Sequence, residues 1–440
     1  MTADERTDAP EGADPHAGLR ATIERLAPIE RLPCSEGEHA AAYLIADRLR
    51  ELGCEVRVEA EPAYGSYAWP VGALSALAAV GGLLGKGAGG RLAGTAGGAV
   101  AAAALADEIS YGRQYARRIV SPRRTAYNVV AEAGEQAGAR TLVVTVHHDA
   151  APTGAIFDQR LERWFVRRHP EIVARMTENP PLWWAAMAGP VAVALGALTG
   201  SRGLRRTGTV LSLLTAAAMA DIATRRAVPG ANDNLSGVAV LVALAESLRR
   251  RPLEGLRVIL LSAGAEEALQ EGIRGFARRH FGSLPRERTW FLNLDTVGSG
   301  NLVLLDAEGP LRMEPYDAAF CDLVADRAAA LGIPVRRGLR SRNSTDGVVP
   351  NRHGYPTACL VSIDDEMLLP HYHLPTDLPE HVDYDCVAAA ARLTEAVARA
   401  LAAGFTGLSR LSRLSGCGVI GLSGCRVIGL SGLHSCGMNS

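Results

Sequence analysis

The sequence predicts an α/β fold with a mixed, largely parallel central sheet and helices on both faces, interrupted by two apolar helical hairpins. Apolar strand-like runs alternate with amphipathic helical runs from residue 125 onward, which is the pattern of a sheet covered on both sides. Two further stretches, 69–106 and 181–223, are apolar and nearly free of charge. With 440 residues, 48% of them hydrophobic, the chain is long enough for one enzyme domain with insertions.

The elements follow in order along the chain. Residues 36–53 place apolar residues at helical spacing, Gly53 is suited to end that helix, and 54–60 alternate as a strand. Later strands are expected at 128–134, 140–150, 256–264, 289–298, 301–306 and 357–364. Helices are expected between them at 237–251, 318–332 and 385–404.

The ends of the chain have a different character from the main domain, 19–405. Residues 1–18 are acidic and polar and lack the basic and apolar regions of a signal peptide, so we expect a disordered tail. Residues 406–440 contain the repeat LSGCGVIG–LSGCRVIG, which is typical of a disordered low-complexity tail. The alternative for this tail is a metal-binding or lipid-modified cysteine segment.

Each apolar stretch consists of two apolar halves of about 15–19 residues around a short basic turn, at or just below the ~20 residues that span a bilayer. Trp69, Trp183 and Trp184 stand where interfacial aromatics belong. We therefore expect residues 69–106 and 181–223 to associate with a membrane. The alternative is a pair of Ala/Gly-rich hairpins buried in a soluble protein.

The charges favour a cytoplasmic position for the main domain. Both hairpin turns are basic, but the segments that flank the hairpins contain more arginines, and the N-terminus has no export signal. The eight cysteines form no CxxC pair, which fits reduced thiols better than a disulfide framework. A net charge of -1 gives no reason to expect nucleic acid as a partner.

Side chains able to bind a metal follow five apolar strands or lie in the loops just after them, where open α/β sheets build their sites. They are His147 and Asp149, Asp233, the pair Glu266–Glu267, Asp295, and His373. Each alone has a plainer explanation: a structural histidine, a helix cap at Asp233, or a solvated glutamate pair. Five in succession at strand ends indicate a metal site.

These segments read H-x-D, N-D-N-x-S-G, G-A-E-E, N-L-D-x-x-G and Y-H-x-x-x-D. In this order they resemble the co-catalytic di-zinc aminopeptidase family, of the aminopeptidase Y and bacterial leucyl aminopeptidase type. The likeness covers residues 19–60, 125–160 and 228–403, and it implies a zinc exopeptidase fold, two Zn²⁺ ions and a peptide substrate.

The resemblance also implies roles for single residues. Asp233 would bridge both metals, and Glu266 would be the general base. Asp149 follows its histidine at the family's spacing, which favours His147 over His148 as the ligand, and Asp149 would orient that imidazole. The terminal ligands of one zinc would be His147 and Asp295, and those of the other Glu267 and His373.

Aminopeptidase activity is the leading hypothesis. A carboxypeptidase or amidohydrolase of the same superfamily would share the chemistry and differ in its pocket, and a non-catalytic membrane or receptor-like homologue would have lost ligands. The segment EEALQEGIRGF departs from the family's EExGLxGS, so side-chain preference does not carry over. Because the second hairpin is inserted between Asp149 and Asp233, we expect the hairpins to tether the catalytic mouth near the membrane.

Overall fold

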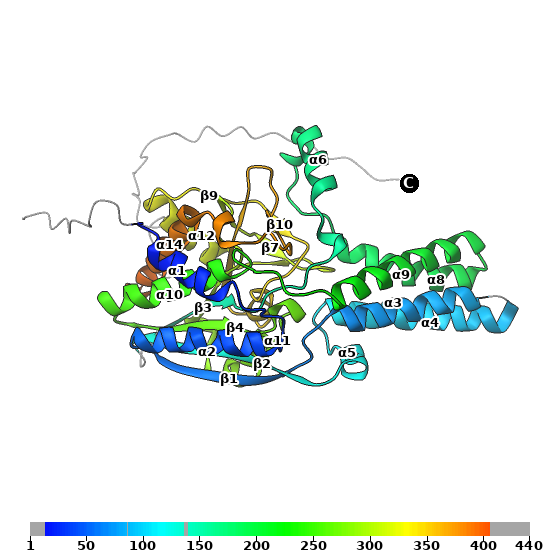
Figure 1. The fold of residues 1–440 in the computed structure, drawn as a ribbon, viewed down its shortest axis with the longest axis horizontal. Helices are drawn as coiled ribbons and strands as arrows, with labels where there is room; N and C mark the ends of the chain where they lie inside the picture. Colours follow the sequence, from blue (N-terminus) through cyan, green and yellow to red (C-terminus); the bar gives the residue numbers. More distant parts are fainter. Residues whose placement is uncertain (1–13, 86, 136–139, 405–440) are drawn as a thin grey trace, which may run out of the picture. The chain divides into compact units, whose positions relative to one another are not determined.

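The computed structural model describes residues 14–85, 87–135 and 140–404 of the chain (Figure 1). The predicted tail 406–440 and residues 1–13 of the predicted tail 1–18 lie outside these described residues. The rest of that N-terminal tail overlaps the first helix, α1, which spans Ala17–Leu26.

An eight-stranded sheet forms the centre, in the order β1-β2-β4-β3-β5-β11-β6-β9. The neighbours β4, β3, β5 and β11 are parallel, whereas β1–β2, β2–β4 and β11–β6 are antiparallel. The predicted mixed, largely parallel sheet is therefore confirmed. The strands are β1 (Glu55–Ala63), β2 (Arg124–Gly134), β3 (Arg140–His147), β4 (Leu256–Ala263), β5 (Thr289–Leu294), β6 (Asn301–Leu304), β9 (Val335–Arg336) and β11 (Thr357–Ile363).

Both faces of the sheet are covered. Val143 of β3 belongs to one hydrophobic cluster with Phe276 of α11, and its neighbours Leu142 and Val144 point to the other face, where α10 and α14 pack. All three β3 residues are fully buried, which explains the unbroken apolar run in the sequence. The covering helices include α2 (Glu36–Glu51), α10 (Leu235–Arg250), α11 (Glu271–His280), α12 (Ala318–Ala330), α13 (Val348–Arg352) and α14 (Tyr384–Ala402).

The two predicted hairpins join into one four-helix bundle that projects from the sheet domain (Figure 1). Helices from different hairpins pack on each other, α3 on α9 and α4 on α8. The tip of the bundle lies at the end of α3 and the start of α9, near Leu84 and Arg202, and its root lies at the sheet domain. The helices are α3 (Ala68–Leu84), α4 (Gly87–Ile109), α8 (Leu182–Thr199) and α9 (Arg202–Ala223), so the first hairpin extends slightly beyond the predicted 69–106.

Small residues allow the bundle helices to approach closely. A Cβ atom added at Gly98 would lie 2.7 Å from the backbone nitrogen of Ala194, and one at Gly208 would lie 2.5 Å from that of Val193. Near the root the bundle buries large apolar side chains, among them Val71, Leu105, Ile109 and Ile222. Elsewhere many large apolar side chains point outward, including Leu83, Leu84, Leu92, Val100, Leu198, Val210 and Leu214. A bundle in water would bury more of these leucines.

By length and composition, Gly87–Ile109 is the one described helix that could cross a membrane. The helices Ala68–Leu84 and Trp183–Thr199 are also apolar but shorter.

Short segments connect these parts. Helix α5 (Tyr115–Val120) follows the first hairpin, and α6 (Arg160–Arg168) and α7 (Pro170–Val173) precede the second. A small second sheet is formed by β7 (Ala307–Glu308), β8 (Glu314–Pro315) and β10 (Arg340–Ser341), in the order β10-β7-β8. Within it the fully buried Glu308 accepts hydrogen bonds from the backbone nitrogen and Oγ1 of Thr345, at 3.1 and 3.0 Å.

We predict that Glu308 makes stability pH-dependent. Burial raises the pKa of Glu308 to about 8, so the stability contributed by its protonated form is complete below the unfolded pKa of about 4.5 and is lost as pH rises through about 8. Glu308→Gln keeps an acceptor for Thr345 but cannot ionise. The fall in Tm between pH 5 and pH 8 should be smaller in this variant than in the native chain, and an equal fall in both would refute the prediction.

Candidate metal centre

The predicted ligands converge at the carboxyl ends of the central parallel strands. His147 is the last residue of β3, Glu267 lies in the turn after β4, and Asp295 directly follows β5. Asp233 precedes α10, and His373 lies in the loop after β11. All five are largely buried, and the fold brings these five segments, which are separate in the sequence, into one compact site.

Asp233 stands between the two histidines. Its Oδ1 lies 3.3 Å from Nε2 of His147, and its Oδ2 lies 3.3 Å from Nε2 of His373. Oδ2 of Asp295 is 3.9 Å from the first of these nitrogens, and Oε1 of Glu267 is 3.2 Å from the second. Three three-residue sets have ligand atoms within 4.8 Å of one another. Two of them contain Asp233, one with His147 and Asp295 and the other with Glu267 and His373, and the third consists of His147, Glu266 and Glu267.

The chemistry of these groups fits metal ions. Nδ1 of the buried His373 has no hydrogen-bond partner among the described residues, and its Nε2 faces the carboxylates of Asp233 and Glu267 without hydrogen-bond geometry. Burial raises the pKa of Asp295 to about 7 and also raises the pKa values of Glu266 and Glu267, because each carboxylate leaves water beside other anions. Bound cations would offset the free-energy cost of burying these carboxylates in their charged form. A mixed set of histidines and carboxylates suits zinc.

The neighbouring residues His147 and His148 lie in different electrostatic surroundings. Burial by itself lowers the pKa of His147, but the carboxylates of Asp149 and Asp233 outweigh burial and raise it. His148 points elsewhere: its Nδ1 lies 2.9 Å from Oγ of Ser262, and burial lowers its pKa to about 4. The structure thus brings His147, and not His148, into the cluster.

Asp149 organises the glutamate pair. Its Oδ1 accepts a hydrogen bond from the backbone nitrogen of Glu266, and its Oδ2 accepts one from Glu267, both at 3.0 Å. Oδ1 also lies 3.5 Å from Nδ1 of His147. Asp149 therefore contacts the histidine, as expected, and also holds the turn that carries both glutamates.

Three further residues belong to the site and have no role in the sequence reasoning. Gln270 donates from Nε2 to Oε1 of Glu266 at 2.6 Å, and Asp377 accepts from the backbone nitrogen of Asp233 at 3.1 Å. Asp346 is buried, and neither of its oxygens has a hydrogen-bond partner within the described ranges. Asp377 and Asp346 lie inside segments that carry the family resemblance, whereas Gln270 lies in the segment that departs from it.

The backbone around Asp233 has two local features. The peptide bond between Asp233 and Asn234 is cis. Asn234, and not Asp233, caps α10, because its Oδ1 accepts from the backbone nitrogen of Gly237 at 3.1 Å. This leaves the Asp233 carboxylate available to both ligand sets.

The turn after the glutamate pair is fastened to both ends of the first hairpin. Buried Arg117 of α5 forms ion pairs with Glu108 of α4 and with Glu271, and its Nη1 donates to the carbonyl of Ala268 at 2.8 Å. The other oxygen of Glu271 accepts from the backbone nitrogens of Tyr64 and Gly65, both at 2.8 Å, just before α3. The root of the bundle and the turn that carries Glu266 and Glu267 are therefore joined by one polar network.

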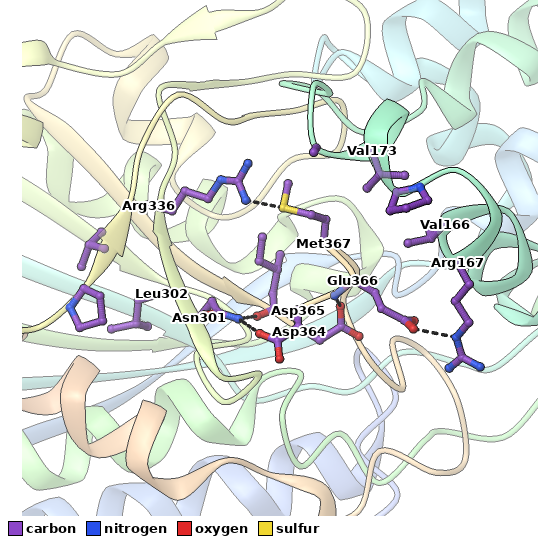
Figure 2. A pocket seen from close by; sticks show the side chains of 15 residues that line it. Val166, Arg167, Val173, Asn301, Leu302, Arg336, Asp364, Asp365, Glu366 and Met367 are labelled. Atoms are coloured by element: carbon purple, nitrogen blue, oxygen red, sulfur yellow. Dashed lines mark hydrogen bonds and ion pairs between the residues drawn. The ribbon is translucent and has the colours of Figure 1, made fainter.

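A cavity of about 190 Å³ connects the candidate centre with the bundle root, since its wall includes Glu267 together with Tyr67, Trp69 and Ile222. A larger hollow of about 820 Å³ lies between α6, α7 and the 363–367 segment (Figure 2). None of the candidate metal ligands lines this larger hollow.

Comparisons with known proteins agree with this geometry. The model of peptidase family M28 matches residues 215–398, which contain four of the five candidate ligands. Similar solved structures include the Bacillus subtilis zinc aminopeptidase BSAP, with 14% identity, a TM-score of 0.50, and coverage of 87% of this chain and 94% of that one. A search of curated proteins finds no match.

Two further structures show the range of this fold. The aminopeptidase of Aneurinibacillus sp. strain AM-1 has 15% identity and a TM-score of 0.50, covering 88% of this chain and 93% of that one. The Tannerella forsythia glutaminyl cyclase has 14% identity and a TM-score of 0.53, covering 87% and 98%. At these identities the likeness shows the fold.

We predict that Arg117→Met destabilises the chain by about 3–5 kcal/mol, because it leaves the buried Glu108 and Glu271 carboxylates without their cation. The neighbouring Arg118 is exposed, so Arg118→Met should change stability by no more than about 0.5 kcal/mol. Chemical unfolding of both variants in detergent measures the difference. Equal stability of the two variants would show that the buried network contributes little.

Proposed function

The chain belongs to peptidase family M28 and is a metallopeptidase, and on this premise we propose that it is a di-zinc aminopeptidase that removes N-terminal residues from peptides. The observation that carries the proposal is Asp233, which belongs to two complete three-residue ligand sets. A carboxylate with one oxygen facing each histidine is suited to bridge two cations. Each set leaves room for a further, non-protein ligand in a tetrahedral zinc site.

Each residue then has a distinct role in the proposed mechanism. Asp233 would bridge the two zinc ions, with His147 and Asp295 on one and Glu267 and His373 on the other. Bound zinc supplies Lewis acidity that polarises a peptide carbonyl and eases ionisation of water. Glu266 takes the proton of the attacking water and returns it to the leaving amine. Gln270 holds Oε1 of Glu266, which leaves the other oxygen for that proton.

The buried acidic surroundings favour a substrate with a positive end. Asp346 has no hydrogen-bond partner for either oxygen among the described residues, and burial raises its pKa well above the usual value, so a nearby cation would stabilise its ionised form. The free ammonium of a peptide N-terminus is a matching cation. A carboxypeptidase is the second candidate, because Arg124 and Arg225 line the cavity beside Glu267 and could pair with a C-terminal carboxylate.

The decisive experiment compares the native chain with Glu266→Ala for bound zinc and for hydrolysis of a panel of aminoacyl anilides. We expect about two zinc ions in both proteins and cleavage by the native chain alone, with a loss of at least 100-fold from removal of the base. Glu162→Ala, at an exposed position of α6, is the matched control and should retain activity.

The other outcomes separate the hypotheses. Two bound metals without cleavage of any free-amine substrate would remove the aminopeptidase claim and direct the search to blocked and C-terminal substrates. Folded protein that binds no metal would refute the site and favour a non-catalytic homologue.

We also propose that the four-helix bundle is embedded in a membrane. Its helices of 17, 18, 22 and 23 residues correspond to about 26–34 Å, close to the ~30 Å of a bilayer core. Glycines at the helix contacts and leucines on the outside are the arrangement that lipid favours, since helices in lipid associate through close packing. The cavity at the bundle root would place the catalytic centre at the membrane surface.

The proposed location is a membrane-associated chain with its catalytic domain in the cytoplasm, on the basis of the arginines that flank the hairpins. If the bundle spans the bilayer, its tip then lies on the opposite side. A Cβ atom meets no heavy atom within 4 Å at Gly203 of the tip or at Gly282 of the catalytic domain, so both accept a cysteine.

These two positions give a matched test. In intact cells a membrane-impermeant maleimide should label Gly203→Cys, whereas Gly282→Cys should react only after lysis, as read by peptide mass. Labelling of Gly282→Cys alone in intact cells would invert the topology. Extraction of the full chain by alkaline carbonate would refute membrane insertion.

A further inference from the structure

Helix α6 exposes its apolar face. Leu161, Trp164 and Phe165 have the spacing of one helix face, and their exposed fractions are 75%, 60% and 41%. On the inner side of α6, Val166 is buried and Arg163 donates to Asp364 and Glu366 at 3.1 and 2.9 Å, whereas Arg167 and Arg168 are exposed. A surface helix of a soluble domain would bury its large apolar residues as it buries Val166 and would not leave three of them in water. This surface, Leu161, Trp164 and Phe165, is called the α6 patch below.

A second apolar surface lies on α5. Tyr115, Ile119 and Val120 are 52%, 83% and 43% exposed, in a segment that directly follows the root end of α4. Ile119 is the most exposed large apolar residue of the described chain. We call Tyr115, Ile119 and Val120, with the arginines around them, the α5 patch.

The arginines of the α5 patch are Arg113, Arg118 and Arg123, and all three are exposed. Within the described residues, no acidic side chain forms an ion pair with any of them. Three cations without ion-pair partners among exposed apolar side chains are the composition of a surface that inserts its apolar part among acyl chains while its arginines contact acidic headgroups.

Helices α5 and α6, which carry the two patches, lie level with the root of the bundle and not with its tip (Figure 1). The segment before α6 is attached to that root, because the backbone nitrogen of Ala155 donates to Oδ2 of Asp221 in the last turn of α9 at 2.7 Å. If the bundle is embedded in lipid, the headgroup layer meets the molecule at this level. The two patches then stand where an interfacial surface is required.

We propose that the α5 and α6 patches form a collar around the bundle root that docks on a membrane surface bearing anionic lipids. The inference rests on the proposed insertion of the bundle, and it adds a lipid headgroup preference that insertion alone does not imply. The α5 patch supplies the charge recognition, and the α6 patch supplies apolar contact on the other side of the root.

The collar is connected to the candidate metal centre. The ring of Phe157, just before α6, packs edge-on against the ring of His373 at 4.5 Å between centroids. Gln159 donates from Nε2 to the carbonyl of Leu369 at 2.6 Å. Docking of α6 on lipid therefore holds the loop that carries a candidate ligand close to the membrane surface, which suits membrane-borne peptides as substrates.

The test uses single-tryptophan forms of the full chain reconstituted in vesicles. The reporters are Trp164 for the α6 patch, Tyr115→Trp for the α5 patch, Trp69 for the bundle, and Trp290 in the sheet as the control, with the remaining tryptophans changed to Phe. Quenching is compared between acyl-brominated phosphatidylglycerol in phosphatidylcholine and brominated phosphatidylcholine in phosphatidylglycerol, at equal bromine content.

We expect both collar reporters and Trp69 to be quenched, and Trp290 to be unaffected. The Tyr115→Trp reporter should be quenched at least twofold more by brominated phosphatidylglycerol. Arg118→Gln combined with Arg123→Gln should remove that preference, whereas Arg249→Gln combined with Arg250→Gln, on exposed α10 positions, should leave it unchanged.

Each negative result of this experiment contradicts a different part of the proposal. Quenching of Trp69 without the collar reporters would overturn the collar and leave the inserted bundle. No quenching of Trp69 would overturn insertion itself. Collar reporters protected from both brominated lipid and aqueous iodide would show that a protein partner or a second copy of the chain covers the patches. Equal quenching by the two lipids would overturn the anionic preference.

Discussion

The concentration of buried negative charge around Asp233 is the constraint on which the rest of the structure depends. Asp233, Glu266, Glu267 and Asp295 lie together out of water, where His147 and His373 contact them and the buried Arg31 adds a positive charge that acts on Asp233. Burying such charges costs several kcal/mol each unless a cation or hydrogen bonds compensate. The raised pKa values of Glu266, Glu267 and Asp295 express this cost, and it explains why the surrounding side chains act mainly to hold these carboxylates in place.

That support comes from a layer of buried polar groups. Asp149 holds the backbone of both glutamates, Asp377 holds the backbone of Asp233, and Gln270 holds the Glu266 side chain. Arg117 extends the layer outward, since it joins the carbonyl of Ala268 to the end of α4. A ligand site built from five separate loops depends on such contacts, because no single helix or strand sets the positions of its members.

Large apolar side chains are distributed differently in the bundle and in the sheet domain. In the sheet domain large apolar residues such as Phe276 and Phe291 are buried, whereas in the bundle Leu83 and Leu214 are outside and glycines are at the contacts. The two parts join at the bundle root, where the cavity reaches Glu267 and where the α5 and α6 patches are exposed. The candidate metal centre of the proposed peptidase thus lies beside the junction of the sheet domain and the bundle.

The sequence alone determined the fold class and the residues that converge on the candidate centre, because strand-length apolar runs and the metal-binding residue types after them are local patterns. It also located both apolar hairpins, with boundaries close to those observed. Only the tertiary structure decided that the hairpins pair into one bundle, that Gln270 and Asp377 support the centre, and that Arg117 links the bundle to the turn after the glutamates. Gln270 lies only four residues from Glu266, but the other contacts join segments up to about 150 residues apart, as between Arg117 and Ala268, and no local pattern encodes them. They arise when packing of the sheet and the helices brings complementary charges and hydrogen-bonding groups into the same buried space.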